Sequence, residues 1–189
     1  MLDGVVFTLT DRAGTPEEVD WLGAKKQIDA AKAAGISQFV FVSSMGGTNP
    51  DNFLNTFGRR KDGSGGDILL WKRKAERYLV DSGVPYTIIH PGGLVDEDGA
   101  QRELVVGVND EITKNPEFAS GGQRSVARAD VARVCKAALG SVSAMNVALD
   151  LVSKIVGDGT PTKDASAVFA SPEKYDFSEV LKDPPSIFS

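Results

Sequence analysis

A strand, a helix and a second strand follow one another within the first 44 residues, and this succession constrains the fold more than any other feature. Asp3–Leu9 is apolar and β-branched, which is typical of a buried strand. Pro16–Gly35 has Pro and two Glu in its first turn and an apolar face, and Gly35 is a helix stop. Ser37–Ser44 has the pattern of a second buried strand. Because one helix joins the two strands, we predict a right-handed βαβ unit and a parallel sheet.

The remaining sequence continues this alternation. We predict further helices at 66–83, Arg128–Leu139 and Thr162–Glu173, and further strands at Pro85–Gly93 and Asn146–Ser153. The stretch Met45–Asp67 is rich in Gly, Asn and Asp, which predicts a long loop or a mobile lid. The last 16 residues, 174–189, are expected either to dock on another part of the protein or to stay mobile.

Composition excludes several classes of function. The 189 residues suffice for one domain with a sizeable core, and a net charge of −5 argues against a general nucleic-acid binder. Cys135 and His90 are the single cysteine and histidine, so we expect no disulfide within the chain and no metal site. One cysteine suits a reducing compartment such as the cytoplasm. We expect no membrane-spanning segment, because no apolar run approaches about 18 residues. We expect no signal peptide, because no charged stretch precedes the first apolar run.

Three long motifs occur in a fixed order: "IDAAKAAGISQFVFVSSMGG", "LLWKRKAERYLVDSGVPYTIIHPGGL" and "RADVARVC". Together they resemble the atypical short-chain dehydrogenase/reductase family, the NAD(P)H-binding group, and in particular its plant and algal members. The resemblance covers roughly Asp3 to Asp164. It implies an α/β fold, a partial Rossmann-like parallel sheet with flanking helices, over residues 1–164. Residues 165–189 would then form a helix end and a tail. Because such relatives are often plastid proteins, the resemblance also implies a chloroplast location.

The phosphate-binding motif of that family is absent from this sequence. Family members begin with a strand, a glycine-rich turn and a helix whose N-terminus holds the pyrophosphate. No G-x-G-x-x-G or G-x-x-G-x-x-G opens this chain, so the resemblance implies an N-terminally truncated domain that starts at the family's fourth strand.

An edge strand follows from that truncation. The family's fourth strand lies beside its first, so Gly4–Thr10 would lack one neighbour, and an uncovered edge invites pairing. We therefore expect this edge to be covered by an upstream segment, by a partner protein or by a second copy of this chain. A partner protein could place the chain at the periphery of a membrane complex.

The usual reductases of this superfamily use Ser, Tyr and Lys, with an Asn on the preceding helix. The resemblance places Lys72 where the family's lysine tends to stand, and Ile68 then occupies the tyrosine position four residues earlier. Counting from Lys74 instead gives Leu70, which also cannot donate a proton. Lys26 stands at the asparagine position. Lys72 can still hold a ribose hydroxyl, or it is a solvated lysine on a helix surface.

Ser43 and Ser44 end a predicted strand at its carboxyl end, where ligands bind in open α/β sheets. The alternative is that they cap the next turn. "HPGG" at His90–Gly93 resembles the family's "RPGG" turn beneath the nicotinamide, and we expect His90 to be structural rather than a proton donor. The candidate cofactor-binding residues are Thr8, Ser43, Ser44, Lys72, Pro91, Gly92 and Gly93; among them Ser43, Ser44 and Lys72 are weak candidates for catalysis.

Two further charged pairs carry expectations. We expect Arg128 and Asp130 to be structural, with Asp130 serving as an N-cap or first-turn anion of the helix that follows. Arg102 and Glu103 are candidates for shaping a substrate side.

Two functional hypotheses remain. For the residues present, the favoured hypothesis is a catalytically degenerate Rossmann-like protein. It would act as a binding or assembly subunit, with a plastid complex as one candidate. The alternative is an NAD(P)H-dependent oxidoreductase whose cofactor-binding N-terminal half lies outside this sequence. We expect NAD or NADP to bind only when that half is present, and no cofactor for this chain alone. An upstream glycine-rich segment would favour the enzyme.

Overall fold

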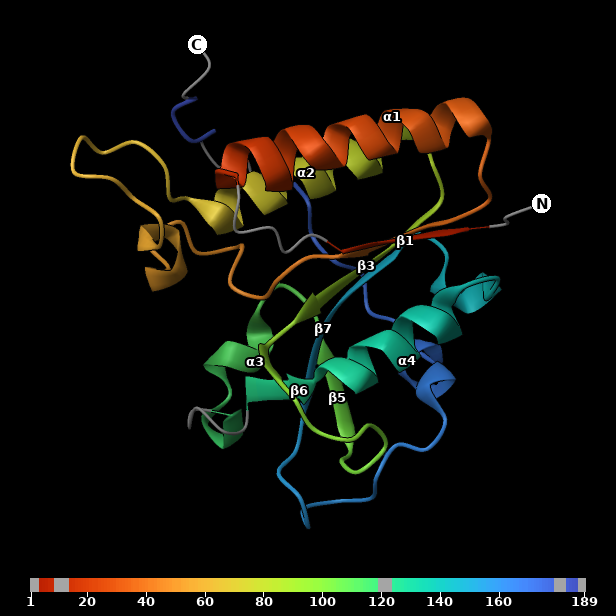
Figure 1. Ribbon diagram of the computed structural model, residues 1–189. Helices are drawn as coiled ribbons and strands as arrows, with labels where there is room; N and C mark the ends of the chain where they lie inside the picture. The colour runs from red at the N-terminus through yellow and green to blue at the C-terminus, as the bar shows by residue number, and fades with distance from the viewer. Residues whose placement is uncertain (1–3, 9–13, 119–123, 179–182, 187–189) are drawn as a thin grey trace.

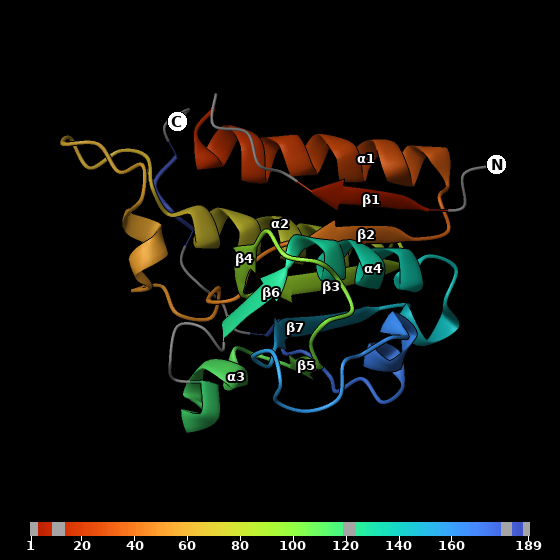
Figure 2. The same cartoon turned by 60° about the horizontal axis from the view of Figure 1, so that its bottom comes forward.

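The computed structural model describes residues 4–8, 14–118, 124–178 and 183–186. Five strands form the main sheet in the order β1–β2–β3–β7–β5, which Figure 2 shows from top to bottom. The first four strands in that order are parallel, and β5 is antiparallel to β7. The strands are β1 (Val5–Thr8), β2 (Phe39–Val42), β3 (Tyr86–Pro91), β5 (Leu104–Gly107) and β7 (Val147–Ser153), and a small parallel pair is formed by β4 (Gly93–Val95) and β6 (Ser125–Ala127).

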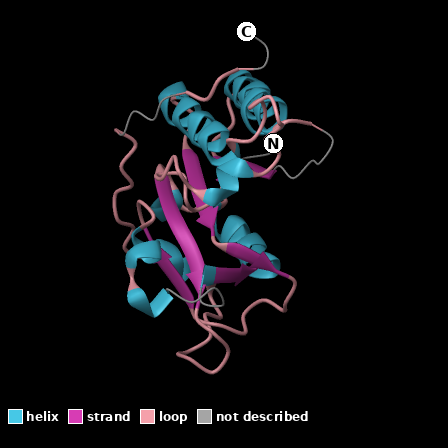
Figure 3. Ribbon diagram, turned by 90° about the vertical axis from the view of Figure 1, so that its left-hand side faces the viewer, coloured by secondary structure: helices cyan, strands magenta, loops and turns pink. Residues whose placement is uncertain are grey.

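Helices connect these strands and flank the sheet. The major ones are α1 (Ala24–Ala34), α2 (Ile68–Ser82) and α4 (Arg128–Ala138), and α1 is preceded without a break by the wider turns of η1 (Glu17–Gly23). Shorter helical turns are η2 (Phe53–Thr56), α3 (Glu111–Lys114), η3 (Pro116–Phe118), η5 (Val142–Ala144) and η6 (Ala165–Phe169). Figures 1 and 3 show α1 and α2 side by side on one side of the strands.

The opening βαβ unit matches its prediction. Val6 stands opposite Val40 in the parallel β1–β2 pair, and the helix between the strands ends at Gly35. Gly35 has φ +62°, a left-handed conformation that costs a glycine little, and its N–H donates to the Ala31 and Lys32 carbonyl groups. The sequence therefore determined the first crossover from strand periodicity and one stop signal.

Alternate residues of the central strands divide the core between two faces. Val40, Ile89 and Leu149 pack with α4 and η6, whereas their chain neighbours Phe41 and Ile88 pack with α1 and α2. Each large apolar side chain buried in this way contributes about 1.5–3 kcal/mol. The predicted α/β architecture, with a parallel sheet between helices, is confirmed.

Four short elements and one helix differ from expectation. The strands β4, β5 and β6 and the helix α3 have three or four residues each, too few for periodicity to reveal them. The predicted helix Thr162–Glu173 is wrong: only Ala165–Phe169 forms a turn of 3₁₀ helix. Asp164 caps this turn by accepting the Ser166 N–H, and Pro172 disfavours helical backbone at Ser171. The chain then turns back toward α2.

The expected edge strand is present in the described part of Gly4–Thr10. Within the described residues, β1 pairs only with β2 and forms one margin of the sheet. Leu9 and Thr10 lie outside the described residues.

Candidate functional site

The two serines that end β2 occupy different environments. Ser43 is buried, and its hydroxyl donates to the Glu76 Oε1 atom on α2. Ser44 is half-buried, and among the described residues its hydroxyl donates to the adjacent Met45 carbonyl at 3.1 Å. The Met45 N–H donates to the Pro91 carbonyl at 3.1 Å, so the chain after Ser44 runs beside the turn that ends β3. Ser44 is therefore the available hydroxyl at this carboxyl edge, and Ser43 belongs to the interior.

Ser43 joins a buried cluster of charged groups, which we call the buried charge cluster: Arg73, Glu76, His90 and Asp150. Glu76 Oε2 lies 3.2 Å from both Arg73 Nη1 and His90 Nε2. His90 Nδ1 lies 3.5 Å from Asp150 Oδ1. All four side chains are at most 3% exposed, so two cations face two carboxylates in an interior where unpaired charges are costly.

The protonation states follow from this arrangement. Burial disfavours the imidazolium, but the Glu76 and Asp150 carboxylates outweigh it and raise the pKa of His90 to about 10. Burial also opposes ionisation of Glu76, yet His90 and Arg73 hold its pKa below the usual value. His90 is thus a fixed cation at neutral pH, as expected for a structural histidine.

The C-terminal segment Tyr175–Phe177 covers the buried charge cluster. The Tyr175 ring lies 4.7 Å from the His90 ring, and the Arg73 guanidinium lies 5.0 Å from Tyr175 and 4.6 Å from Phe177. Arg73 Nη2 also donates to the Asp176 carbonyl at 2.7 Å. Of the two expectations for the tail, this segment therefore meets the one in which it docks.

Lys72 has an ion-pair partner that the sequence did not reveal. Its Nζ lies 2.7 Å from Asp20 Oδ1, and the two side chains are 12% and 7% exposed. Burial raises the pKa of Asp20, although Lys72 opposes the change. Lys72 is therefore neither solvated nor available to hold a ribose in this arrangement.

The turn after β3 is filled by the chain itself. A Cβ on Gly92 would lie 2.2 Å from the Arg124 carbonyl oxygen, so this glycine makes room for backbone rather than for a ligand. Pro91 is buried, whereas Gly93 is exposed and begins β4. Thr8 stands opposite Val42 at the end of β1, and its side chain lies outside the described part of the structure.

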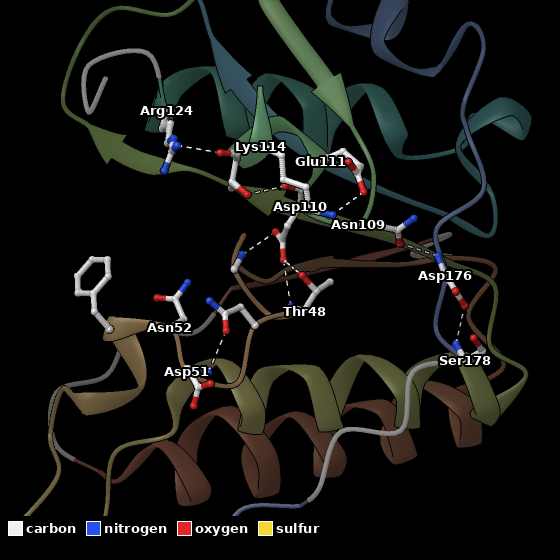
Figure 4. Close-up of a pocket in the computed structure, with 14 residues that line it drawn as sticks. Thr48, Asp51, Asn52, Asn109, Asp110, Glu111, Lys114, Arg124, Asp176 and Ser178 are labelled. Carbon is white, nitrogen blue, oxygen red and sulfur yellow. Dashed lines mark hydrogen bonds and ion pairs between the residues drawn. The ribbon is translucent and has the colours of Figure 1, made fainter. Parts of the chain in front are cut away.

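A polar pocket of about 930 Å³ opens between the loop after β2 and the turn before α3 (Figure 4). Asp110 fixes its rim: the carboxylate accepts the Gly46 N–H at 2.6 Å, the Thr48 N–H at 3.0 Å and the Thr48 hydroxyl at 2.7 Å. The Asp110 N–H donates to Asp150 Oδ2 at 2.8 Å, which ties the rim to the buried charge cluster. The lining includes Asn49, Asp51, Asn52, Phe53, Asn109, Glu111, Lys114, Arg124, Asp176 and Ser178.

Sequence reasoning missed this pocket. Asn109 and Asp110 both have left-handed φ values, +55° and +58°, which Asn and Asp tolerate better than other non-glycine residues. An Asn-Asp pair directly after an apolar run was the one available signal for a tight turn.

The remaining predicted residues lie elsewhere. Arg102 pairs with Glu97, and Glu103 pairs with Lys154 at 2.9 Å. Neither Arg102 nor Glu103 lines the polar pocket. Lys26 is exposed on α1.

Asp130 is buried in the first turn of α4, but it is not an N-cap. Its carboxylate instead accepts the Ala100 N–H at 2.8 Å and pairs with Arg133 at 2.6 Å. Cys135 is buried, and burial raises its thiol pKa to about 11, which fits a core residue.

Within the described ranges, no three His, Cys, Asp or Glu side chains are placed to hold a metal ion together. None of the described helices is both long and apolar enough to cross a bilayer.

Comparisons with known proteins agree with the fold. Residues 2–141 match the profile of the NAD(P)H-binding family. An uncharacterized chloroplastic protein of Arabidopsis thaliana is 55% identical over 159 residues, which cover 84% of this chain and 45% of that protein. Sanguinarine reductase of Eschscholzia californica is 49% identical over 160 residues, which cover 85% of this chain and 54% of that protein. The chain thus spans about half the length of these relatives.

Solved structures show the same fold. A Bacillus halodurans protein assigned to the NAD-dependent epimerases/dehydratases superposes with a TM-score of 0.66 at 27% identity, covering 88% of this chain and 68% of that one. Both the family match and the similarity to the two plant proteins include the serine-ended strand and the helix that carries Lys72. The chain therefore belongs to the NAD(P)H-binding family of atypical short-chain dehydrogenase/reductases, of the plant type.

Proposed function

We propose that this chain forms the nicotinamide and substrate side of an NAD(P)H-dependent oxidoreductase. The observation that carries the proposal is the half-buried Ser44 hydroxyl, which stands at the carboxyl end of a central parallel strand and, within the described residues, bonds the adjacent carbonyl. A 49% identical relative named as a reductase supports it. The chain spans about half of that relative, so a segment outside these residues can supply the phosphate-binding loop.

The residues present fit one end of a nicotinamide dinucleotide. Ser44 and Gly93 remain accessible at the edge, whereas Ser43, Lys72 and Gly92 are committed to contacts within the chain. No glycine-rich pyrophosphate turn occurs in the sequence. A bound NAD(P)H would supply a hydride, and these residues would line only its nicotinamide end.

Ser44 would orient the substrate by donating its hydroxyl proton to a carbonyl or similar acceptor. The proton that completes the reduction would come from water. Neither candidate for the usual tyrosine position, Ile68 or Leu70, can donate a proton. The His90 imidazolium is buried between two carboxylates with a pKa of about 10. The polar pocket beside the loop after β2 is large enough for a small organic substrate.

We place the protein in a plastid. The support is that several relatives carry the word chloroplastic in their names, among them the protein of Arabidopsis thaliana that is 55% identical and the TIC 62 protein of Pisum sativum, which is 39% identical over 92 residues.

A second candidate is a non-catalytic binding or assembly subunit at the periphery of a membrane complex. The observation that favours it is the commitment of both reductase-type groups, Lys72 to Asp20 and Ser43 to Glu76. In this reading the fold is retained for a protein partner or a second copy at the β1 edge.

Titration with NADPH, followed by nicotinamide fluorescence, distinguishes the two. The assay compares this chain with the same chain joined to any coding sequence upstream of Met1. Binding by either form, with reduction of phenanthrenequinone as a broad acceptor, supports the oxidoreductase; absence of binding and turnover in both forms contradicts it.

A matched pair of variants tests Ser44. Ser44→Ala should lower turnover about tenfold or more at an unchanged melting temperature, because one transition-state hydrogen bond is lost. Ser43→Ala should lower the melting temperature, because Glu76 loses a buried donor. Unchanged turnover in Ser44→Ala would remove Ser44 from the proposal.

A further inference from the structure

A loop between η2 and α2 projects from the body of the protein. Figures 1 and 2 show it as the yellow segment extending to the left, away from the sheet and from α1. Residues 56–63 form an unbroken run of exposed positions. We call residues 56–66 the projecting loop.

The neck of the projecting loop is closed by hydrogen bonds to one buried residue. The Asn55 carbonyl accepts the Asp67 N–H at 2.8 Å, and the Asn55 side-chain oxygen accepts the Leu69 N–H at 2.9 Å. A Cβ on Gly65 would lie 2.6 Å from the Gly58 carbonyl oxygen, so the outgoing and returning backbone segments of the loop pack closely where they pass at Gly58 and Gly65. The loop is thus held out by a closed base, with its tip in solvent.

Two aromatic rings stand exposed at this neck. Phe57 is 59% exposed and Phe53 is 66% exposed, and their ring centroids lie 5.7 Å apart in an edge-to-face pair. An exposed pair of phenylalanines is unusual on a protein surface and marks a contact site.

Three consecutive cations follow the rings. Arg59, Arg60 and Lys61 are all exposed, and residues 56–66 contain one carboxylate, Asp62, against these three cations. Asp62 is turned back onto the loop, where it accepts the Ser64 N–H and hydroxyl. Arg59 pairs with Asp67 at the neck, Arg60 is exposed within electrostatic reach of Glu18 and Asp62, and Lys61 is exposed. The whole chain has a net charge of −5, and this tip therefore opposes the sign of its own protein.

We propose that the projecting loop docks on an anionic lipid surface, with Phe57 entering the headgroup region and Arg60 and Lys61 pairing with lipid charges. Aromatic side chains favour the membrane interface, and basic residues beside them are attracted to anionic leaflets. A convex tip of about ten residues suits a deformable bilayer better than a protein partner, which needs roughly 800 Å² per side. The loop would hold the protein peripherally, by its own residues.

The test is co-sedimentation of the full chain with vesicles. One set contains phosphatidylcholine and phosphatidylglycerol in equal parts, and the other contains phosphatidylcholine alone. The chain should bind the anionic vesicles, and raised salt should release it. Replacing Arg60 and Lys61 by Gln should weaken partitioning roughly thirtyfold, since each cation near an anionic leaflet contributes about a fivefold factor. Adding Phe57→Ser should weaken it further.

A matched triple variant controls for overall charge and apolarity. Lys32→Gln, Lys136→Gln and Val142→Ser remove two exposed cations and one exposed apolar side chain from other surfaces, and should leave vesicle binding unchanged. Thermal unfolding of both triple variants verifies that each is folded. The proposal is overturned if the chain ignores anionic vesicles, binds neutral vesicles equally well, or loses binding equally in the two triple variants.

Discussion

Lys72 Nζ on α2 lies 2.7 Å from Asp20 Oδ1 on η1, and this ion pair is largely buried. It links η1, which begins the first helical connection, to α2. The lysine that the sequence suggested as a cofactor-binding residue is here part of the packing between these two helices.

Lys72→Met should therefore destabilise the protein by about 3 kcal/mol, because it leaves the Asp20 carboxylate buried without its cation. Urea unfolding of Lys72→Met, Asp20→Asn and the double variant measures the coupling. The double variant should recover much of the loss. If Lys72→Met were as stable as the parent, the ion pair with Asp20 would not stabilise the fold, and Lys72 could again be considered as a ligand-binding residue.

Stability should fall as pH rises from about 6.5 to about 10, because the folded His90 holds its proton over this range and the unfolded histidine does not. The sign follows because the pKa of His90 is higher in the folded state than in the unfolded state. Its contribution to the free energy of unfolding is complete below pH 6.5 and is lost as the pH rises to about 10. The slope from one proton is at most about 1.4 kcal/mol per pH unit. Chemical unfolding across this range should show the slope in the parent.

His90→Gln provides the control for that slope, because Lys25 and Tyr175, whose pKa values are also raised in the folded state, add to the pH dependence at high pH. The variant should be less stable near neutrality and should lack the part of the slope due to His90. Parallel pH profiles for the two proteins would show that His90 is not charged in the folded state.

Gly92→Ala should cost about 1–3 kcal/mol or more, because its Cβ would approach the Arg124 carbonyl oxygen to 2.2 Å. Gly93→Ala is the matched control: its nearest contact with that oxygen would be 3.6 Å. Differential scanning calorimetry should show a lower melting temperature for the first variant only. Equal melting temperatures would mean that the turn can move away from Arg124.

The β1 margin should be covered by an upstream segment, by a partner or by a second copy, because β1 pairs only with β2 among the described strands. Size-exclusion chromatography with light scattering, run over a range of concentrations, should show association of the isolated chain. Limited proteolysis should cleave near β1 when the chain is diluted. A monomer that resists protease at all concentrations contradicts this expectation.

Long periodic segments were predictable from the sequence because their signals are local. The strands that contain Val40 and Ile89 and the helix that ends at Gly35 are marked by apolar periodicity and by a stop residue, and both act within a few positions of the chain. The carboxyl edge with its two serines followed from the same local pattern. The short strands and the turn at Asn109 and Asp110 were missed, since three or four residues carry no period.

The sequence by itself determined the family and the parallel sheet, because these follow from motif order and from the alternation of strands and helices. Only the tertiary structure decided what each candidate side chain does. Lys72, Ser43 and Gly92 are committed to Asp20, Glu76 and the Arg124 backbone, all of which are distant in the chain. Such partners meet through packing between separate elements, and no local pattern encodes that meeting.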